Sequence, residues 1–204
     1  MVRLNNVRMR SMLILLVQFL GNCNGIEFKE PDEYSCEEVR YASSGQSDMC
    51  SCKSGSCTLS VTLEFGHVNI PKERTGLKGE LHLLGFNVPG SPGRSPGPTL
   101  RVRGGDTLKV LLKNKMPPEN VSTASTTKNG YRAFAAVNLH THGLHVSPLA
   151  PADEVVITVV NPNEAHQYVY HIPEDHMGGT HWYHPHWHGA VSMHVNFGAP
   201  GSRG

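Results

Sequence analysis

Alternation between apolar and polar residues is the dominant pattern of this chain. In the clearest stretch, 58–65, every second side chain is apolar: Leu59, Val61, Leu63 and Phe65. Because successive side chains of a strand point to opposite faces, this pattern predicts a half-buried β-strand. Further extended stretches are predicted at 79–86, 99–103, 107–112, 135–139, 155–160, 167–172 and 179–184.

Turn-forming residues separate these stretches. The segment 90–98 is almost entirely Gly, Ser and Pro, residues that disfavour both helices and sheet ladders. The chain holds 21 Gly and 14 Pro, and they gather between the short apolar runs. No stretch shows sustained helical periodicity. The sequence therefore predicts an all-β fold, an antiparallel β-sandwich or barrel.

The first 25 residues have the pattern of a secretory signal peptide. Three arginines precede the apolar run 12–20, and small and polar residues follow from Gly21 to Gly25. The run is short for a membrane span, which needs about 20 residues. We expect export, or membrane anchoring if the signal stays uncleaved. Export would also make Asn120-Val121-Ser122 an acceptor for N-glycosylation.

Residues 26–57 form a polar, cysteine-rich leader that holds Cys36, Cys50, Cys52 and Cys57. In an exported chain these cysteines are expected to form disulfides. Four cysteines allow three pairings, and only a bond between Cys50 and Cys52 is disfavoured by their spacing. The alternative is a zinc or copper thiolate cluster on Cys50-Ser51-Cys52, which oxidation to disulfides would prevent.

Charge indicates little about partners. The formal net charge is +1 and only 17% of residues are charged, which gives no indication of a nucleic-acid-binding surface. Histidine is the residue in excess, with 13 copies. Binding partners therefore have to be inferred from individual binding sites, and the histidines are the main candidates for such a site.

Two His-X-His triplets carry the candidate chemistry: His140 with His142, and His184 with His186. Alternation along a strand places both imidazoles of a triplet on one side, so two triplets supply four nitrogen ligands for copper, zinc or iron. Because only neutral imidazole binds metal, affinity should fall as the pH drops through roughly 6 to 7. No carboxylate or sulfur pattern accompanies the triplets. Hydrogen bonding alone is the other interpretation, and it is the one expected for His145, His166, His171, His176, His181 and His194.

Three motifs, in this order and spacing, resemble the amino-terminal plastocyanin-like domain of multicopper oxidases of the laccase-like group. They are PGPTLRVRGGDT at 96–107, NLHTHGL at 138–144 and GTHWYHPH at 179–186. The resemblance covers about 58–194. It implies a Greek-key cupredoxin fold and copper as the cofactor.

The resemblance also implies a role for each histidine of the two triplets. His140 resembles a ligand of the type 2 copper, while His142, His184 and His186 resemble ligands of the type 3 copper pair. An alternative register would use His186 and His188 as the second triplet. Trp182-Tyr183 directly before His184 favours the first register, and whether His188 replaces a ligand stays open.

The chain also departs from the family pattern. Complete members carry two further histidine motifs in a later domain, and one of these is a His-Cys-His that binds the type 1 copper. All five cysteines here precede Thr58, so a type 1 site of that kind is excluded. The expected plastocyanin-like domain spans 58–196. We expect 197–204 to be an unstructured tail, and the sandwich to lack its closing strand.

These features lead to three functional hypotheses. The first is a copper-binding domain of an exported multicopper oxidase, with half of the trinuclear-cluster histidines; oxidation of a small reducing substrate by dioxygen would need a further cupredoxin domain or chain. Whether this chain alone is an enzyme is therefore left open. The second is a non-catalytic exported protein that sequesters copper or zinc. The third, a zinc hydrolase, lacks an evident carboxylate base near the triplets.

Overall fold

The computed structural model describes residues 31–40, 47–70, 78–91, 95–118, 133–199 and 201–203. The expected signal peptide and the glycosylation acceptor Asn120 lie outside these ranges, so both stay predictions. Within the described ranges, no helix has the length and apolar character needed to cross a membrane.

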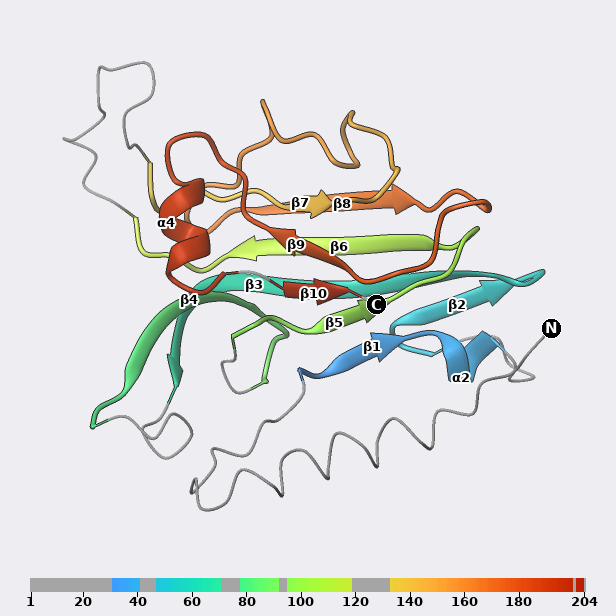
Figure 1. The fold of residues 1–204 in the computed structure, drawn as a ribbon, viewed down its shortest axis with the longest axis horizontal. Helices are drawn as coiled ribbons and strands as arrows, with labels where there is room; N and C mark the ends of the chain where they lie inside the picture. The colour runs from blue at the N-terminus through green and yellow to red at the C-terminus, as the bar shows by residue number, and fades with distance from the viewer. Residues whose placement is uncertain are drawn as a thin grey trace, which may run out of the picture.

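Strands dominate the described part of the chain, as the sequence predicts (Figure 1). Two helices accompany them, of only four and six residues, which is too short to leave a helical period in the sequence. The elements are β1 Glu33–Ser35, α2 Glu37–Arg40, β2 Cys50–Lys53, β3 Ser56–Ile70, β4 Leu81–Asn87, β5 Thr99–Arg101, β6 Thr107–Asn114, β7 His140–His142, β8 Ala165–His171, β9 His181–His184, α4 Val191–Asn196 and β10 Gly201–Arg203.

The strand β3 organises the largest sheet, in which β2, β3, β6 and β8 follow one another and β4 also pairs with β3. Pairing is antiparallel between β2 and β3, β3 and β4, and β6 and β8. Within this all-β fold two strand pairs are parallel, β3 with β6 and β1 with β5. A parallel pair needs a long connection, and the chain between β3 and β6 supplies it through β4 and β5.

The core follows from the alternation seen in the sequence. Leu63 and Phe65 of β3 and Leu108, Val110 and Leu112 of β6 are fully buried, while Glu64, Lys109 and Leu111 between them are more exposed. Tyr168 and Tyr170 of β8 complete this layer. Burying one such leucine stabilises the fold by about 1.5–3 kcal/mol, so the sheet is held mainly by this face.

Two of the predicted strands differ from the structure. The stretch 155–160 is not a strand, because the Glu154 carboxylate accepts hydrogen bonds from the backbone N–H groups of Val156 and Ile157 at 2.8 and 2.9 Å and folds the segment into a turn. These bonds lower the pKa of Glu154 to about 2. At 135–139 one isolated bridge joins Val137 to Val160, and the strand begins only at His140.

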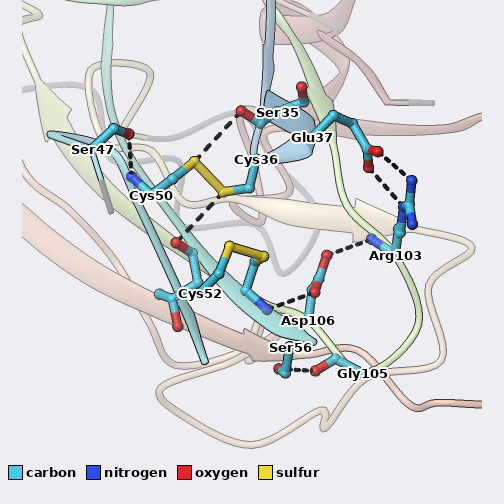
Figure 2. The surroundings of a disulfide bond; sticks show 12 residues. Ser35, Cys36, Glu37, Ser47, Cys50, Cys52, Ser56, Arg103, Gly105 and Asp106 are labelled. Atoms are coloured by element: carbon cyan, nitrogen blue, oxygen red, sulfur yellow. Dashed lines mark hydrogen bonds and ion pairs between the residues drawn. A yellow bond between two sulfur atoms is a disulfide. The ribbon is translucent and has the colours of Figure 1, made fainter. Parts of the chain in front are cut away.

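The four leader cysteines form disulfides, as predicted, and the pairs are Cys36–Cys50 and Cys52–Cys57. Figure 2 shows them next to Asp106, whose carboxylate accepts the backbone N–H groups of Cys57 and Arg103, each at 2.9 Å. The leader therefore packs directly on the main sheet. Because these sulfurs are oxidised, the alternative thiolate cluster is excluded in this structure.

The carboxyl-terminal residues contradict the expected unstructured tail. The strand β10 pairs antiparallel with β9, placing Gly201 opposite Tyr183. A Cβ atom at Gly201 would lie 2.0 Å from the Tyr183 ring, so only glycine permits this approach. Tyr183 also donates its hydroxyl to the Pro98 carbonyl at 2.7 Å. The strand β10 thus lies at the edge of the sheet formed by β7 and β9.

The buried Asn114 side chain generates a prediction for stability. Its amide donates to the carbonyls of Ala135 and Val160 at 2.6 and 2.8 Å, and its oxygen accepts the Met116 N–H at 2.9 Å. Asn114→Ala should lower the free energy of unfolding by roughly 2–4 kcal/mol, because the Ala135 carbonyl and the Met116 N–H lose this partner, while the Val160 carbonyl keeps the bond from the Val137 N–H. Urea unfolding measures this. The control Asn69→Ala, at an exposed position, should change it by less than about 0.5 kcal/mol; equal effects would contradict the prediction.

His194 generates a prediction for the pH dependence of stability. The side chain is fully buried against Phe65, its Nε2 donates to the Phe134 carbonyl at 2.6 Å, and burial lowers its pKa. Below pH about 6.5, the ordinary pKa of histidine, His194 is protonated in the unfolded chain but still neutral in the folded chain. The free energy of unfolding therefore falls as the pH drops. His194→Gln should reduce the loss of unfolding free energy between pH 7.5 and 5.5. An unchanged slope, matching that of the exposed control His171→Gln, would refute this.

Candidate metal centre

The pairing of β7 with β9 brings the two His-X-His triplets together. These strands are antiparallel, and their register sets His140 opposite His184 and His142 opposite Trp182. The triplets are more than forty residues apart in sequence, and the sheet alone makes them neighbours. Three of the four predicted ligands lie on these two strands, and His186 follows β9 by two residues.

The histidine rings converge on a single depression. Ligand nitrogens of His140, His142 and His184 all lie within 4.8 Å of one another, and Nδ1 of His142 is 3.3 Å from Nε2 of His184. The His186 ring stands at the edge of this group, with its centroid 5.0 Å from that of His140. The depression has a volume of about 420 Å³, and its opposite wall is a face of α4: Val191, Ser192, Val195 and Asn196.

A carboxylate that the sequence did not reveal orients the first triplet. Asp153 accepts a hydrogen bond from Nδ1 of His140 at 2.7 Å and two more from the backbone N–H and the hydroxyl of Thr141. Burial opposes ionisation of Asp153, but these bonds outweigh it and lower the pKa. No carboxylate pattern accompanies the triplets in the sequence, and the fold brings Asp153 to His140 from a separate segment. With Nδ1 occupied, the Nε2 lone pair of His140 is left for a metal.

His184 is oriented in the same way by a backbone carbonyl. Its Nδ1 donates to the Pro185 oxygen at 2.8 Å, which leaves the Nε2 lone pair for a metal. Burial lowers the pKa of His184 to about 4. Burial and the neighbouring His140 also lower the pKa of His186. These two imidazoles therefore stay neutral, and able to bind metal, at pH values where an ordinary histidine is protonated.

Trp182 packs against two of the candidate ligands. Its indole stacks on the rings of His142 and His184, with centroid distances of 5.0 and 4.1 Å and an interplanar angle of 25° in each case. The ring lines the depression and is 38% exposed. Stacking on both imidazoles restricts their rotation, so Trp182 helps to hold the ligand geometry in place.

The other histidines are used elsewhere. His188 is exposed and does not line the depression, so the geometry favours the register with His184 and His186. His176 accepts the His145 N–H at 3.0 Å through Nε2 and donates to the Met177 carbonyl through Nδ1. His194 donates to a carbonyl from within the core. The expectation of ordinary hydrogen bonding holds for His176 and His194.

The donor set fits copper. It consists of imidazole nitrogens with hydrogen-bonded partners behind two of them, and imidazole suits copper and zinc among the biological metals. The exposed His142 and His186 leave the depression open on one side. Such a half-enclosed group can bind ions by itself, and it can also form one wall of a larger site.

Comparisons with known proteins show which family and which proteins this chain is similar to. Residues 126–201 match the family model described as Multicopper oxidase. The chain is 31% identical over 97 residues to Laccase-2, and 37% identical over 98 residues to Laccase-1, both of Thanatephorus cucumeris; each match covers 46% of this chain. The chain spans only 14% of the length of either laccase.

Solved structures show the same fold. A multicopper oxidase from Campylobacter jejuni, described as a metallo-oxidase, superposes with a TM-score of 0.54 at 23% identity, covering 87% of this chain and 30% of that one. A laccase from Pediococcus acidilactici gives a TM-score of 0.54 at 18% identity, covering 86% and 29%. The chain therefore has the cupredoxin fold of these multicopper oxidases, and its residues 126–201 match the multicopper oxidase family model.

Proposed function

We propose that this chain binds copper through His140, His142, His184 and His186, as the first domain of an exported multicopper oxidase. The observation that carries the proposal is the convergence of two His-X-His triplets across β7 and β9. Ligand nitrogens of His140, His142 and His184 lie within 4.8 Å of one another. The match of residues 126–201 to the multicopper oxidase family supports copper over zinc.

The arrangement also supports a division of the ligands. His142 Nδ1 and His184 Nε2, 3.3 Å apart, point at a common position and would share one ion of the type 3 pair. His186 would serve the other ion of the pair. His140, oriented by Asp153, would present Nε2 to the type 2 copper. Bound copper would supply the one-electron redox chemistry. The residues of this chain would keep the ligand imidazoles neutral and orient their lone pairs toward the metal.

Four histidines make half of a trinuclear cluster. A further cupredoxin domain or chain would complete it and supply the type 1 copper, with dioxygen and a small reducing substrate as reactants. For the present chain alone we expect copper binding with little or no oxidase turnover. The two leader disulfides support export, because such bonds persist in oxidising compartments.

Sequestration of copper or zinc without catalysis is the second candidate, and the exposed His142 and His186 favour it, because an open depression admits ions readily. An oxygen-bridged, magnetically coupled copper pair would favour the oxidase domain, whereas isolated mononuclear signals would favour sequestration. A zinc hydrolase is not supported, since Asp153 is committed to His140 and Thr141 and is not available as a base.

Replacing all four candidate ligands tests the proposal directly. The variant with His140, His142, His184 and His186 changed to Ala should lose bound copper, because no imidazole lone pair then faces the depression. Elemental analysis after copper loading and dialysis measures the stoichiometry. A matched control with three exposed sheet histidines, His67, His82 and His171, changed to Ala should keep wild-type copper. Equal copper in wild type and the four-ligand variant would refute the assignment.

Asp153→Asn tests the role of the carboxylate. The amide keeps the shape but removes the charge that fixes the His140 tautomer, so copper affinity should fall about 10- to 100-fold. Competition with a chelator of known affinity measures it. Asp175→Asn, at an exposed position, is the control and should leave the affinity unchanged. An unchanged affinity in Asp153→Asn would mean that His140 is oriented by something else.

A further inference from the structure

We propose that Asn138 is a positioning residue that sets the place of His186 relative to the first triplet. The inference rests on the proposed copper site and concerns how its two halves are held together. Asn138 lies two residues before His140 and is fully buried. Its side chain, unlike those of the ligands, faces no metal position; it acts through the backbone of His186.

The need for such a residue arises where the β7–β9 ladder stops. The strand β9 ends at His184, and the next residue, Pro185, has no N–H to donate. His186 is therefore the one candidate ligand outside the paired strands. Extending the register from His140 opposite His184 by two residues places Asn138 opposite His186. At this point the His186 N–H donates to Oδ1 of Asn138 at 2.7 Å, so a side chain continues the ladder.

The other half of the carboxamide holds Asn138 itself. Its Nδ2 donates to the carbonyls of Val155 and Thr158 at 3.1 and 3.3 Å. Those carbonyls belong to the turn that the Glu154 carboxylate closes. Because Nδ2 faces two acceptors and Oδ1 faces a donor, only one orientation of the amide satisfies all three groups.

Asn138 thus connects both triplets and the adjacent turn through one planar group. The His186 ring centroid lies 5.0 Å from that of His140 and 5.9 Å from that of His184, and this spacing depends on where the His186 backbone is anchored. Removing the carboxamide would leave one partly buried N–H and two carbonyls without this partner and would free His186 to shift. The three histidines on β7 and β9 would keep their places.

A double-mutant cycle on copper affinity tests this mechanism. Asn138→Ala should weaken copper binding about tenfold, as expected for an outer partner of a ligand. His186→Ala should weaken it at least as much. In the His186→Ala background, Asn138→Ala should have no further effect, because the residue it positions is gone. Asn161→Ala, an exposed asparagine, is the matched control. Additive losses in the double variant would overturn the proposal.

Amide hydrogen exchange of the metal-free protein provides a second readout. The His186 N–H should exchange faster in Asn138→Ala than in wild type, while the amides within β6 stay protected. Should Asn138→Ala fail to fold, Asn138→Asp keeps the Oδ1 acceptor and loses the Nδ2 donor. It should retain protection of the His186 N–H, while the fold loses stability because the Val155 and Thr158 carbonyls lose this donor. Exposure of the His186 amide in a folded Asn138→Asp would count against the proposal.

The outcomes also separate the two proposals. If wild type binds no copper, the proposed function fails and the role of Asn138 fails with it. If wild type binds copper and folded Asn138→Ala binds it equally tightly, only the role of Asn138 is refuted.

Discussion

The candidate site depends on the pairing of two short strands. Neither triplet forms a site alone, because a His-X-His supplies two imidazoles and the remaining ligands must come from elsewhere. The three-residue β7 and the four-residue β9 meet in one register, His140 opposite His184, and a slip by one residue would turn the rings to the other face. The rest of the structure holds this register: β10 packs on β9 through Gly201, and the Tyr183 hydroxyl joins β9 to Pro98.

A second layer of hydrogen bonds prepares the ligands chemically. Asp153 and the Pro185 carbonyl each accept a hydrogen bond from Nδ1–H of one histidine, which leaves the Nε2 lone pair of that histidine available. Burial then keeps His184 in the neutral form. The same residues also satisfy the backbone around the site, since Asp153 accepts the Thr141 N–H. Ligand orientation and strand stability are therefore provided by the same contacts, and a change to one affects the other.

The site is open as well as convergent. His142 and His186 are exposed, and α4 covers only one side of the depression. This openness suits the role of one wall of a larger cluster, which is the arrangement proposed for a chain that spans 14% of its laccase relatives. It also explains why the rings need anchors behind them: without surrounding protein on the open side, Trp182, Asp153 and Asn138 set their positions from within.

Much of the fold and the four candidate ligands could be predicted from the sequence, because alternation and His-X-His spacing are local properties. Alternation located β3, β6 and β8, and the three motifs indicated a resemblance to the multicopper oxidases, whose family model matches residues 126–201. The prediction of a strand was wrong at 155–160, where the Glu154 carboxylate accepts hydrogen bonds from the backbone amides. The prediction of an unstructured tail was wrong at 197–204, where β10 forms with Gly201 against the Tyr183 ring. Asp153 carried no signal, and Asn138 belonged to the NLHTHGL motif without an assigned role, because their contacts with His140 and the His186 backbone form only on folding. The sequence alone thus determined which residues can bind a metal; the tertiary structure decided which of them meet, and what turns each ring, because those contacts join residues far apart in the chain.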